Sequence, residues 1–268
     1  MARLKEYNGY YCESEYEYAF IGFLETEGWI YSSGNNISRV TKRDVLIADD
    51  FKKFIVDTNP DLTEDEVTQI FDNVRLVGSE SDFATLHKVY GWMVNGIQFT
   101  PQDGIARMIP LIDFKKDSNK NIFRVVNQFT VEYTNNGQKE NRRPDVLLFV
   151  NGMPLCVIEL KNPADANATI YDAWEQINIR YWRDIPHLLH YCTLACISDG
   201  VKTRLGTVRT PYEHFYAWRR VNDGDAVSTL PFEETKTMIK GVYAPERFLE
   251  IFRDYIYFQD NIYDSDEV

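Results

Sequence analysis

The chain has 268 residues, of which 44% are hydrophobic and 14% aromatic, so it can bury a substantial core and is not a disordered protein. Its formal net charge of -12 argues against a free-standing, non-specific DNA binder, because such proteins place many Lys and Arg side chains against phosphates. The negative charge lies at the two ends, with -4 over residues 1–30 and -7 over residues 223–268, so that residues 31–222 carry only -1.

The first part of the chain is predicted to be helical. Apolar residues recur at helical spacing over residues 13–27, and Gly28 ends that segment. A second helical zone covers about residues 43–77, within which Thr63 and Glu66 have the spacing of a capping box.

The period of the apolar residues then changes, and strands alternate with helices. Residues 122–133 and 145–161 are predicted to be strands, 169–183 a helix, 189–198 a strand and 233–258 helical. Residues 223–228 have the composition of a linker. This order predicts an α/β fold with a central mixed sheet flanked by helices.

Several classes of function are excluded by the sequence. The stretch from Gly91 to Gly96 has the spacing of a phosphate loop, but Ile97 stands where Lys is required, so we expect this chain not to bind ATP. The four cysteines have neither the spacing of a zinc site nor the density of a disulfide scaffold. No apolar stretch approaches the roughly 20 residues that span a bilayer, and no charged leader precedes one, so we expect a cytoplasmic protein without membrane contact.

Residues 145–161 are predicted to form a β-hairpin, because Asn151-Gly152 between two apolar runs is a strong hairpin signal. A two-residue loop would put Asp145 and Glu159 on opposite faces, whereas a three-residue loop that includes Met153 places them directly opposite each other. We predict the three-residue loop. One face then carries Asp145, Leu147, Phe149, Val157, Glu159 and Lys161, and the reverse face carries Val146, Leu148, Cys156, Ile158 and Leu160. Both faces are largely apolar, which favours a central position in a sheet covered on both sides.

The charged residues of this hairpin predict a metal site. Two carboxylates about 5 Å apart at their Cβ atoms are costly to bury without a cation, and Mg²⁺ prefers such hard oxygen ligands. The Leu160 carbonyl lies between Glu159 and Lys161 and could complete the metal shell. Lys161 could orient a water and offset charge on a phosphate. For Asp145, Glu159 and Lys161 alone, a buried ion-pair cluster without a metal is an equally good interpretation.

Pro-Asp, an apolar strand, a tight turn and Glu-x-Lys resemble the PD-(D/E)xK nuclease superfamily. More specifically, the chain resembles the restriction (R) subunit of type I restriction-modification enzymes over roughly residues 11–258. The segments that carry this resemblance are 111–114 (LIDF), 125–129 (VVNQF), 142–155 (RRPDVLLFVNGMPL), 157–162 (VIELKN), 184–186 (DIP), 197–200 (ISDG), 204–207 (RLGT) and Trp218.

The resemblance implies a restriction endonuclease-like core with additional N-terminal helices and a C-terminal helical segment. It implies an endonuclease domain over residues 1–222, with the core at about 105–220. Residues 223–268 would then be a linker and a helical connection toward a helicase-like motor that this chain lacks. The implied activity is Mg²⁺-dependent cleavage of double-stranded DNA after translocation driven by ATP, which the full-length subunit binds, in a complex with methylation (M) and specificity (S) subunits.

The sequence departs from the family on the helix after the hairpin. The family places a Gln and a Tyr four residues apart there, whereas the candidates here, Gln176 and Tyr181, are five apart. At 100° per residue they would lie about 140° apart on an α-helix, so one site could not receive both. A π-bulge between them would restore a common face. Without one, Arg180 could face the phosphate, and Tyr181 fits plain core packing.

Other candidates rest on weaker signals. The resemblance suggests Glu17 as an additional metal ligand, although as one of six acidic residues in the first 30 it also fits a solvated surface position. Arg142 and Arg143 precede Asp145 and could contact phosphates, or could simply be exposed turn residues. The main basic concentration includes Lys202, Arg204 and Arg209 and is the better candidate for contacts with the DNA backbone.

Two other functions stay open at this point. One is a stand-alone nuclease or junction resolvase of the same superfamily, which helicase sequences downstream of Val268 would exclude. The other is a catalytically silent module that docks onto a motor, which the acidic ends and the shifted Tyr181 keep open. From its charge and the missing motor, we expect the isolated chain to be weak or inactive on DNA.

Overall fold

The computed structural model describes residues 13–259 apart from 79, 117, 163–168, 228–229 and 231. The helices are α1 (Glu13–Thr26), α2 (Ala48–Thr58), α3 (Glu64–Arg75), α4 (Asp82–Asn95), α5 (Ile170–Glu175), α6 (Trp182–Asp184), α7 (Pro186–Leu189), α8 (Glu233–Met238) and α9 (Pro245–Asp254), with 3-10 turns η1 (Gly34–Asn36) and η3 (Tyr212–His214) and π-helical segments η2 (Gln176–Tyr181) and η4 (Ile239–Tyr243). The strands are β1 (Ile30–Ser33), β2 (Ile97–Phe99), β3 (Arg107–Ile109), β4 (Phe123–Asn127), β5 (Val131–Asn135), β6 (Gln138–Arg142), β7 (Val146–Val150), β8 (Met153–Leu160), β9 (Leu194–Ser198) and β10 (Thr203–Thr207).

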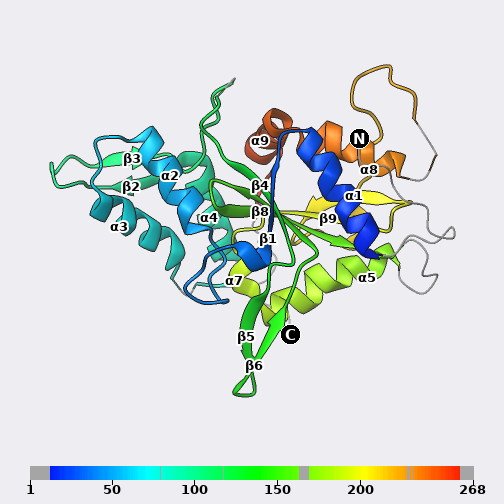
Figure 1. Cartoon of the computed structure of the whole chain (residues 1–268), viewed down its shortest axis with the longest axis horizontal. Coiled ribbons are helices and arrows are strands. Elements are labelled where there is room, and N and C mark those ends of the chain that lie inside the picture. Colours follow the sequence, from blue (N-terminus) through cyan, green and yellow to red (C-terminus); the bar gives the residue numbers. More distant parts are fainter. Residues whose placement is uncertain are drawn as a thin grey trace.

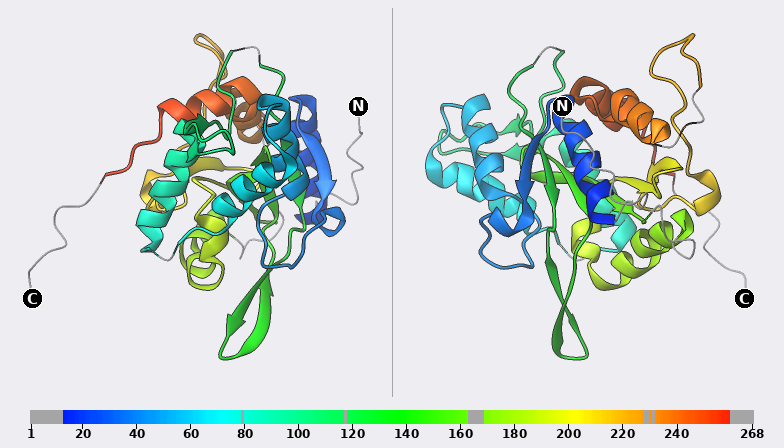
Figure 2. Two further views of the ribbon diagram at one scale, coloured as in Figure 1. Left: turned by 90° about the vertical axis from the view of Figure 1, so that its left-hand side faces the viewer. Right: turned by 45° about the vertical axis from the view of Figure 1, so that its right-hand side comes forward.

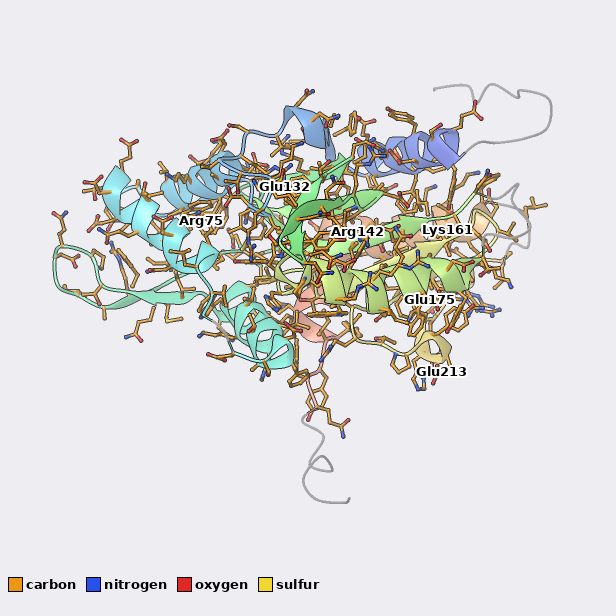
Figure 3. All side chains as sticks on the ribbon, turned by 90° about the horizontal axis from the view of Figure 1, so that it is seen from below. Arg75, Glu132, Arg142, Lys161, Glu175 and Glu213 are labelled. Atoms are coloured by element: carbon orange, nitrogen blue, oxygen red, sulfur yellow. The ribbon has the colours of Figure 1, made fainter. Side chains whose placement is uncertain are left out.

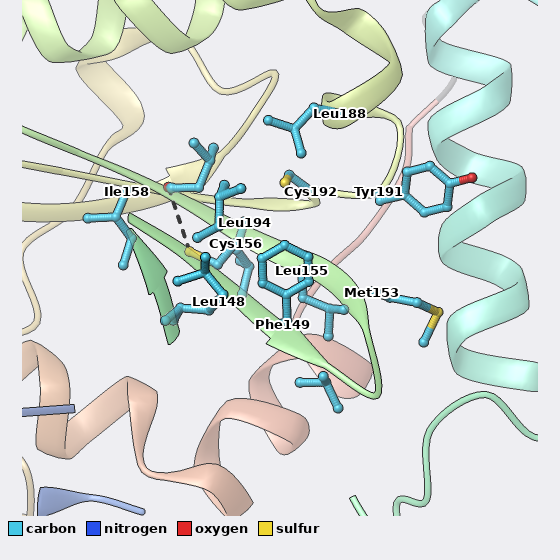
Figure 4. Packing of buried hydrophobic residues seen from close by; sticks show 14 of the residues in the cluster. Leu148, Phe149, Met153, Leu155, Cys156, Ile158, Leu188, Tyr191, Cys192 and Leu194 are labelled. Carbon is cyan, nitrogen blue, oxygen red and sulfur yellow. Dashed lines mark hydrogen bonds between the residues drawn. The ribbon is translucent and has the colours of Figure 1, made fainter. Parts of the chain in front are cut away.

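A six-stranded sheet forms the centre of the molecule, in the order β1-β4-β7-β8-β9-β10 (Figure 1). The pairs β1–β4 and β8–β9 are parallel and the other three pairs are antiparallel. This arrangement confirms the predicted α/β fold with a central mixed sheet. The hairpin β7–β8 occupies the two middle positions and every one of its residues is buried, as its two apolar faces predict (Figure 4).

Helices cover both faces of this sheet. Helix α1 contacts β1, β8 and η4, while α5 contacts β8 and β9 and η2 contacts β8. In the right-hand view of Figure 2, α8 and α9 lie above the strands and α5 lies below them. Among the described residues, no helix combines the length and the apolar character needed to cross a lipid bilayer.

The helices after residue 222 share the core with the rest of the chain. Tyr243, Phe248 and Phe252 are fully buried there, and the Trp29 indole donates to the Tyr243 carbonyl at 2.6 Å. The boundary at residue 222 stays a prediction, but the segment that follows it packs as part of the same body.

A second two-stranded sheet, β5–β6, leaves the main body and projects beyond it (Figures 1 and 2). The single strand predicted over residues 122–133 is therefore wrong. Gln128 has a positive φ of 57°, which turns the chain between β4 and β5. We refer to β5–β6, with its turn, as the arm.

The helical predictions agree with the structure in their main features. Helix α1 lies within the predicted 13–27, and α3 begins with the capping box of Thr63 and Glu66. The strand predicted over 189–198 begins only at Leu194, because Pro186 starts the short helix α7 before it. Helix α4, the hairpin β2–β3 and strand β10 were not predicted.

Candidate active site

The turn of the β7–β8 hairpin differs from the predicted three-residue loop. Val150 pairs with Met153, so the turn contains only Asn151 and Gly152, whose φ angles of 51° and 77° are those of a type I′ turn. The Gly152 N–Cα–C segment packs so closely under Ile47 that an added Cβ would collide with the Ile47 carbonyl oxygen. The turn prediction was wrong because Asn-Gly suits two-residue turns best.

A β-bulge restores the predicted register further along the hairpin. Phe149 pairs with Pro154 but Leu148 pairs with Cys156, so one extra residue, Leu155, lies between the two pairs. Beyond the bulge Leu147 pairs with Val157 and Val146 with Ile158. Continuing this register places Asp145 opposite Glu159, as predicted.

The two carboxyl groups lie at the end of the central strands and interact with each other. The Leu160 N–H donates to Asp145 Oδ2 at 2.8 Å. Glu159 is fully buried, and its Oε2 has no hydrogen-bond partner in the part of the chain that the structure describes. Burial, and after it the neighbouring Asp145 carboxylate, raises the pKa of Glu159 well above its ordinary value.

A chain of hydrogen bonds joins Glu159 to Lys161. The Tyr181 hydroxyl donates to Glu159 Oε1 at 2.6 Å, Gln176 Nε2 donates to the Tyr181 hydroxyl at 2.8 Å, and Lys161 Nζ donates to Gln176 Oε1 at 2.8 Å. Lys161 lies beside the helical ribbon that carries Gln176, as Figure 3 shows. Burial, followed by the Glu159 carboxylate, raises the pKa of Tyr181 well above its ordinary value. Tyr181 is therefore a neutral donor at the site.

The π-helical segment η2 runs from Gln176 to Tyr181 and is what brings both side chains to one site. In a π-turn residues five apart are neighbours, so this segment supplies the π-bulge that Gln176 and Tyr181 need to share one face. Arg180 then points outward, with its side chain 53% exposed and 3.9 Å from Glu175. The structure thus gives the inward position to Tyr181 rather than to Arg180.

Glu17 is buried rather than solvated, but it is held by other partners. Its Oε1 accepts from Asn127 Nδ2 at 2.6 Å and from Gln128 Nε2 at 3.4 Å. Asn127 pairs with Val146, so this cluster adjoins the Asp145 end of β7. Among the described residues no three Asp, Glu, His or Cys side chains converge as a metal-binding group, so the structure does not bring Glu17 together with the two carboxylates.

A buried hydroxyl cluster behind the site was missed in the sequence. The Lys161 N–H donates to the Ser198 carbonyl at 2.8 Å, and the Ser198 hydroxyl lies 2.7 Å from both the Tyr16 and Thr203 hydroxyls. Thr235 completes the cluster, 2.9 Å from Tyr16 and 2.8 Å from Thr203. The available signal in the sequence was a polar residue at a strand terminus: Ser198 is the last residue of β9 and Thr203 is the first residue of β10.

The arginines before Asp145 have different environments. The Arg142 guanidinium pairs with the buried Asp184 at 2.6 Å, and Arg143 is exposed. Hydrogen bonds from Arg183 and then from Arg142 hold the pKa of Asp184 below its ordinary value. Arg142 therefore has a structural partner, whereas Arg143 is open to a ligand.

The predicted basic concentration lies on and around β10. Lys202 is exposed, Arg204 lies 5.8 Å from the centre of the Tyr212 ring, and Arg209 lies 4.8 Å from the centre of the Trp182 ring. Their contact with DNA stays a prediction.

The donor atoms at the hairpin end fit a hard divalent cation. Both carboxylates supply oxygen, and the unpartnered Glu159 Oε2 is a buried acceptor that a cation would satisfy. The Leu160 N–H points toward Asp145, and because the N–H and C=O of one strand residue point the same way, its carbonyl lies on the same side. Oxygen-only ligands favour Mg²⁺ over softer metals such as Zn²⁺.

Comparison with known proteins gives a consistent result. Residues 10–214 match the family model described as type I restriction enzyme R protein N terminus. A putative type I restriction enzyme MjaIXP endonuclease subunit from Methanocaldococcus jannaschii is 30% identical, over 90% of this chain and 25% of that protein. The type I restriction enzyme HindI endonuclease subunit from Haemophilus influenzae is 29% identical, over 92% of this chain and 24% of that protein. The chain thus spans about a quarter of the length of these relatives.

Proposed function

Because the chain belongs to the family of type I restriction enzyme R protein N termini, we propose that it is the Mg²⁺-dependent endonuclease domain of such a subunit. Its substrate would be the phosphodiester bonds of double-stranded DNA. The observation that carries this proposal is the buried Glu159 carboxyl, which lies beside Asp145 and has one oxygen that receives no hydrogen bond from any described residue. An unsatisfied buried polar group costs about 1–3 kcal/mol, a cost that a bound cation would remove.

Each residue of the site has a distinct role in this proposal. Asp145 and Glu159, with the Leu160 carbonyl, would hold the cation. A bound Mg²⁺ supplies an activated water and neutralises charge on the phosphate. Lys161 would stabilise the negative charge that develops on the phosphate as water attacks phosphorus and the P–O bond to the leaving oxygen breaks.

Gln176 and Tyr181 act on these groups rather than on the substrate. Gln176 accepts from Lys161 Nζ and donates to Tyr181, which in turn donates to Glu159. The two side chains thereby fix the direction of the ammonium group and of the carboxylate at once. We regard both as positioning residues.

The remaining features of the proposal concern the longer protein. The relatives are named endonuclease subunits of type I restriction enzymes, and they are about four times as long as the matched segment. We propose that ATP-driven translocation is performed by the additional domains of such a subunit, and that M and S subunits provide methylation and target recognition.

The test uses the complete restriction complex, assembled with Lys161→Ala in this domain. Target plasmid is incubated with Mg²⁺ and ATP, and both DNA cleavage and ATP hydrolysis are measured. We expect cleavage to be lost while ATP hydrolysis continues, because only the cutting site is altered. Lys120→Ala, an exposed lysine distant in sequence from the site, is the matched control and should cleave normally.

Plasmid cleavage by the Lys161→Ala complex at the normal rate would contradict the proposal. Calorimetry on Asp145→Asn and Glu159→Gln variants adds a second measurement. If neither change weakens Mg²⁺ binding, the domain is a docking module rather than a nuclease.

A further inference from the structure

We propose that the arm enters a groove of double-stranded DNA and holds the duplex against the Asp145–Glu159 site. This inference rests on the proposed function, since it concerns the same substrate. It adds a DNA-contacting element that neither the family model nor the basic residues around β10 indicate.

The arm is a separate two-stranded ribbon. Its strands pair from Val131–Arg142 at the base to Asn135–Gln138 at the tip, and the turn residues Asn136 and Gly137 have φ angles of 48° and 80°. Its far end stands clear of the other elements in all three views of Figures 1 and 2. Val131 and Tyr133 at the base of the arm are buried in the core, whereas residues 134–139 beyond them are exposed and available to a ligand.

The chemistry of the outer arm is that of a nucleic-acid contact rather than a protein interface. All residues from Thr134 to Lys139 are exposed and none of them has an apolar side chain. Asn135, Asn136 and Gln138 carry amide groups, which both donate and accept hydrogen bonds and so match the edges of bases. Burying these amides in an apolar protein contact would be costly.

The dimensions of the arm suit a groove. A two-stranded β-ribbon fits the major groove of B-DNA, which is about 12 Å wide and about 8.5 Å deep. The five residues of β6, from Gln138 near the tip to Arg142 at the base, span about 17 Å at the usual rise of a strand. Since the arm is longer than the groove is deep, the tip can reach the floor of the groove while the base of the arm stays outside it.

The base of the arm leads directly into the site. Strand β6 ends at Arg142 and Asp145 follows three residues later. A duplex that holds the tip in its groove would thus present its backbone to the carboxylates. The exposed Arg143, between the arm and Asp145, would face that backbone.

The arm is tied to the element that carries Tyr181. Arg142 pairs with Asp184 of α6, which directly follows η2, and the Arg142 guanidinium also lies 5.5 Å from the centre of the Tyr133 ring. Tyr133 in turn donates to Glu140 across the arm at 2.6 Å. These contacts join the base of the arm to the element that carries Tyr181, so a groove contact of the arm would help to position the phosphate at the site.

The local charge agrees with this interpretation. Residues 131–143 carry Glu132 and Glu140 against Lys139, Arg142 and Arg143, a net charge of +1 in a chain of -12. The outermost of these charges is Lys139, whose side chain is 85% exposed and lies 3.9 Å from the Glu132 carboxylate.

The closing experiment measures duplex binding by the restriction complex with Ca²⁺ in place of Mg²⁺, so that cleavage does not interfere. The arm variant combines Gln138→Ala, Lys139→Ala and Asn141→Ala, three exposed side chains whose loss leaves the ribbon backbone intact. The matched control combines Gln98→Ala, Asn119→Ala and Lys120→Ala, which are also exposed. We expect the arm variant to bind about tenfold more weakly, and its salt dependence to fall by about one counterion for the lost Lys. The control should bind normally.

A photo-crosslinking residue at Thr134 provides the second measurement, with the same residue at Gln98 of the β2–β3 hairpin as control. An adduct with DNA from position 134 and none from position 98 is expected. Normal duplex binding by the arm variant, or bound duplex without an adduct from position 134, would overturn the inference. Both results leave the proposed nuclease function standing. Conversely, an adduct from position 134 in a complex whose cleavage survives Lys161→Ala would overturn the function and not the arm contact.

Discussion

Replacing Tyr181 with Phe removes one hydroxyl from the centre of the site without changing the volume of the buried ring. That hydroxyl donates to Glu159 Oε1 at 2.6 Å and accepts from Gln176. Its effect depends on the state of Glu159. Without a cation the raised pKa favours the neutral carboxyl, whereas a bound cation favours the ionised carboxylate.

The expected magnitudes follow from this difference. A hydrogen bond to a neutral group contributes about 1 kcal/mol to stability, and one to a charged group about 1.5–3 kcal/mol. Tyr181→Phe should therefore lower the free energy of unfolding by about 1 kcal/mol without a cation. In addition, Mg²⁺ binding should lose about 1.4 kcal/mol of free energy, which corresponds to a tenfold larger dissociation constant. At a Mg²⁺ concentration one hundred times the original dissociation constant, the stabilisation by Mg²⁺ should fall from about 2.7 to about 1.4 kcal/mol.

The assay is urea unfolding of the chain in EDTA and in Mg²⁺, followed by tryptophan fluorescence. Tyr191→Phe is the matched control, because this buried tyrosine also donates a hydrogen bond, to the Val74 carbonyl at 2.7 Å. It should cost about 1 kcal/mol in both conditions, since its acceptor is neutral whether or not Mg²⁺ is bound.

Equal stabilisation by Mg²⁺ in Tyr181→Phe and in the unaltered chain would refute the reasoning. It would mean that Tyr181 packs in the core without holding the Glu159 carboxylate. No stabilisation by Mg²⁺ in either protein would refute the cation site itself.

Three further predictions follow from the same site. In EDTA the free energy of unfolding should fall as pH rises above 4.5, the ordinary pKa of Glu, because the raised pKa of Glu159 makes the folded chain hold a proton that the unfolded chain releases. Glu159→Gln should remove that part of the fall, as measured by urea titrations at several pH values. An unchanged pH profile in the variant would contradict the burial argument. Deleting the exposed Ile179 should convert η2 to a regular α-helix, in which Gln176 and Tyr181 are four residues apart and share one face. Mg²⁺ should therefore still stabilise the folded variant. Loss of that stabilisation in a folded variant would show that the π-turn itself is needed. Gly152→Ala should lower the free energy of unfolding by about 3 kcal/mol or more, because φ at position 152 is positive and the added Cβ would meet the Ile47 carbonyl. A melting temperature within a few degrees of that of the unaltered chain would be inconsistent with this turn geometry.

Local features of the fold could be predicted where one face of an element decides its structure. The capping box of Thr63 and Glu66 and the central burial of β7 and β8 follow from short-range patterns of polar and apolar residues. The long strand predicted over residues 122–133 failed because a single left-handed residue, Gln128, divides it. A positive φ at a residue other than Gly leaves little trace in the sequence.

The hairpin register shows how a correct prediction can rest on a wrong reason. Asp145 lies opposite Glu159 as expected, but the shift comes from the bulge at Leu155 and not from a longer turn. A three-residue turn and a bulge in β8 both shift the pairing by one residue. The positions of the charged residues alone therefore could not distinguish these two arrangements. The packing of Ile47 against Gly152 selects the tight turn.

The sequence by itself determined the central hairpin and the identity of its charged residues, because alternation of side chains along a strand fixes which of them share a face. Only the tertiary structure decided how these residues are supported. The π-turn that brings Tyr181 to Glu159, the amide partners of Glu17, and the projection of the arm near Asp145 all depend on contacts between segments far apart in the chain. Such contacts are set by the packing of the whole core, which no local spacing of residues contains.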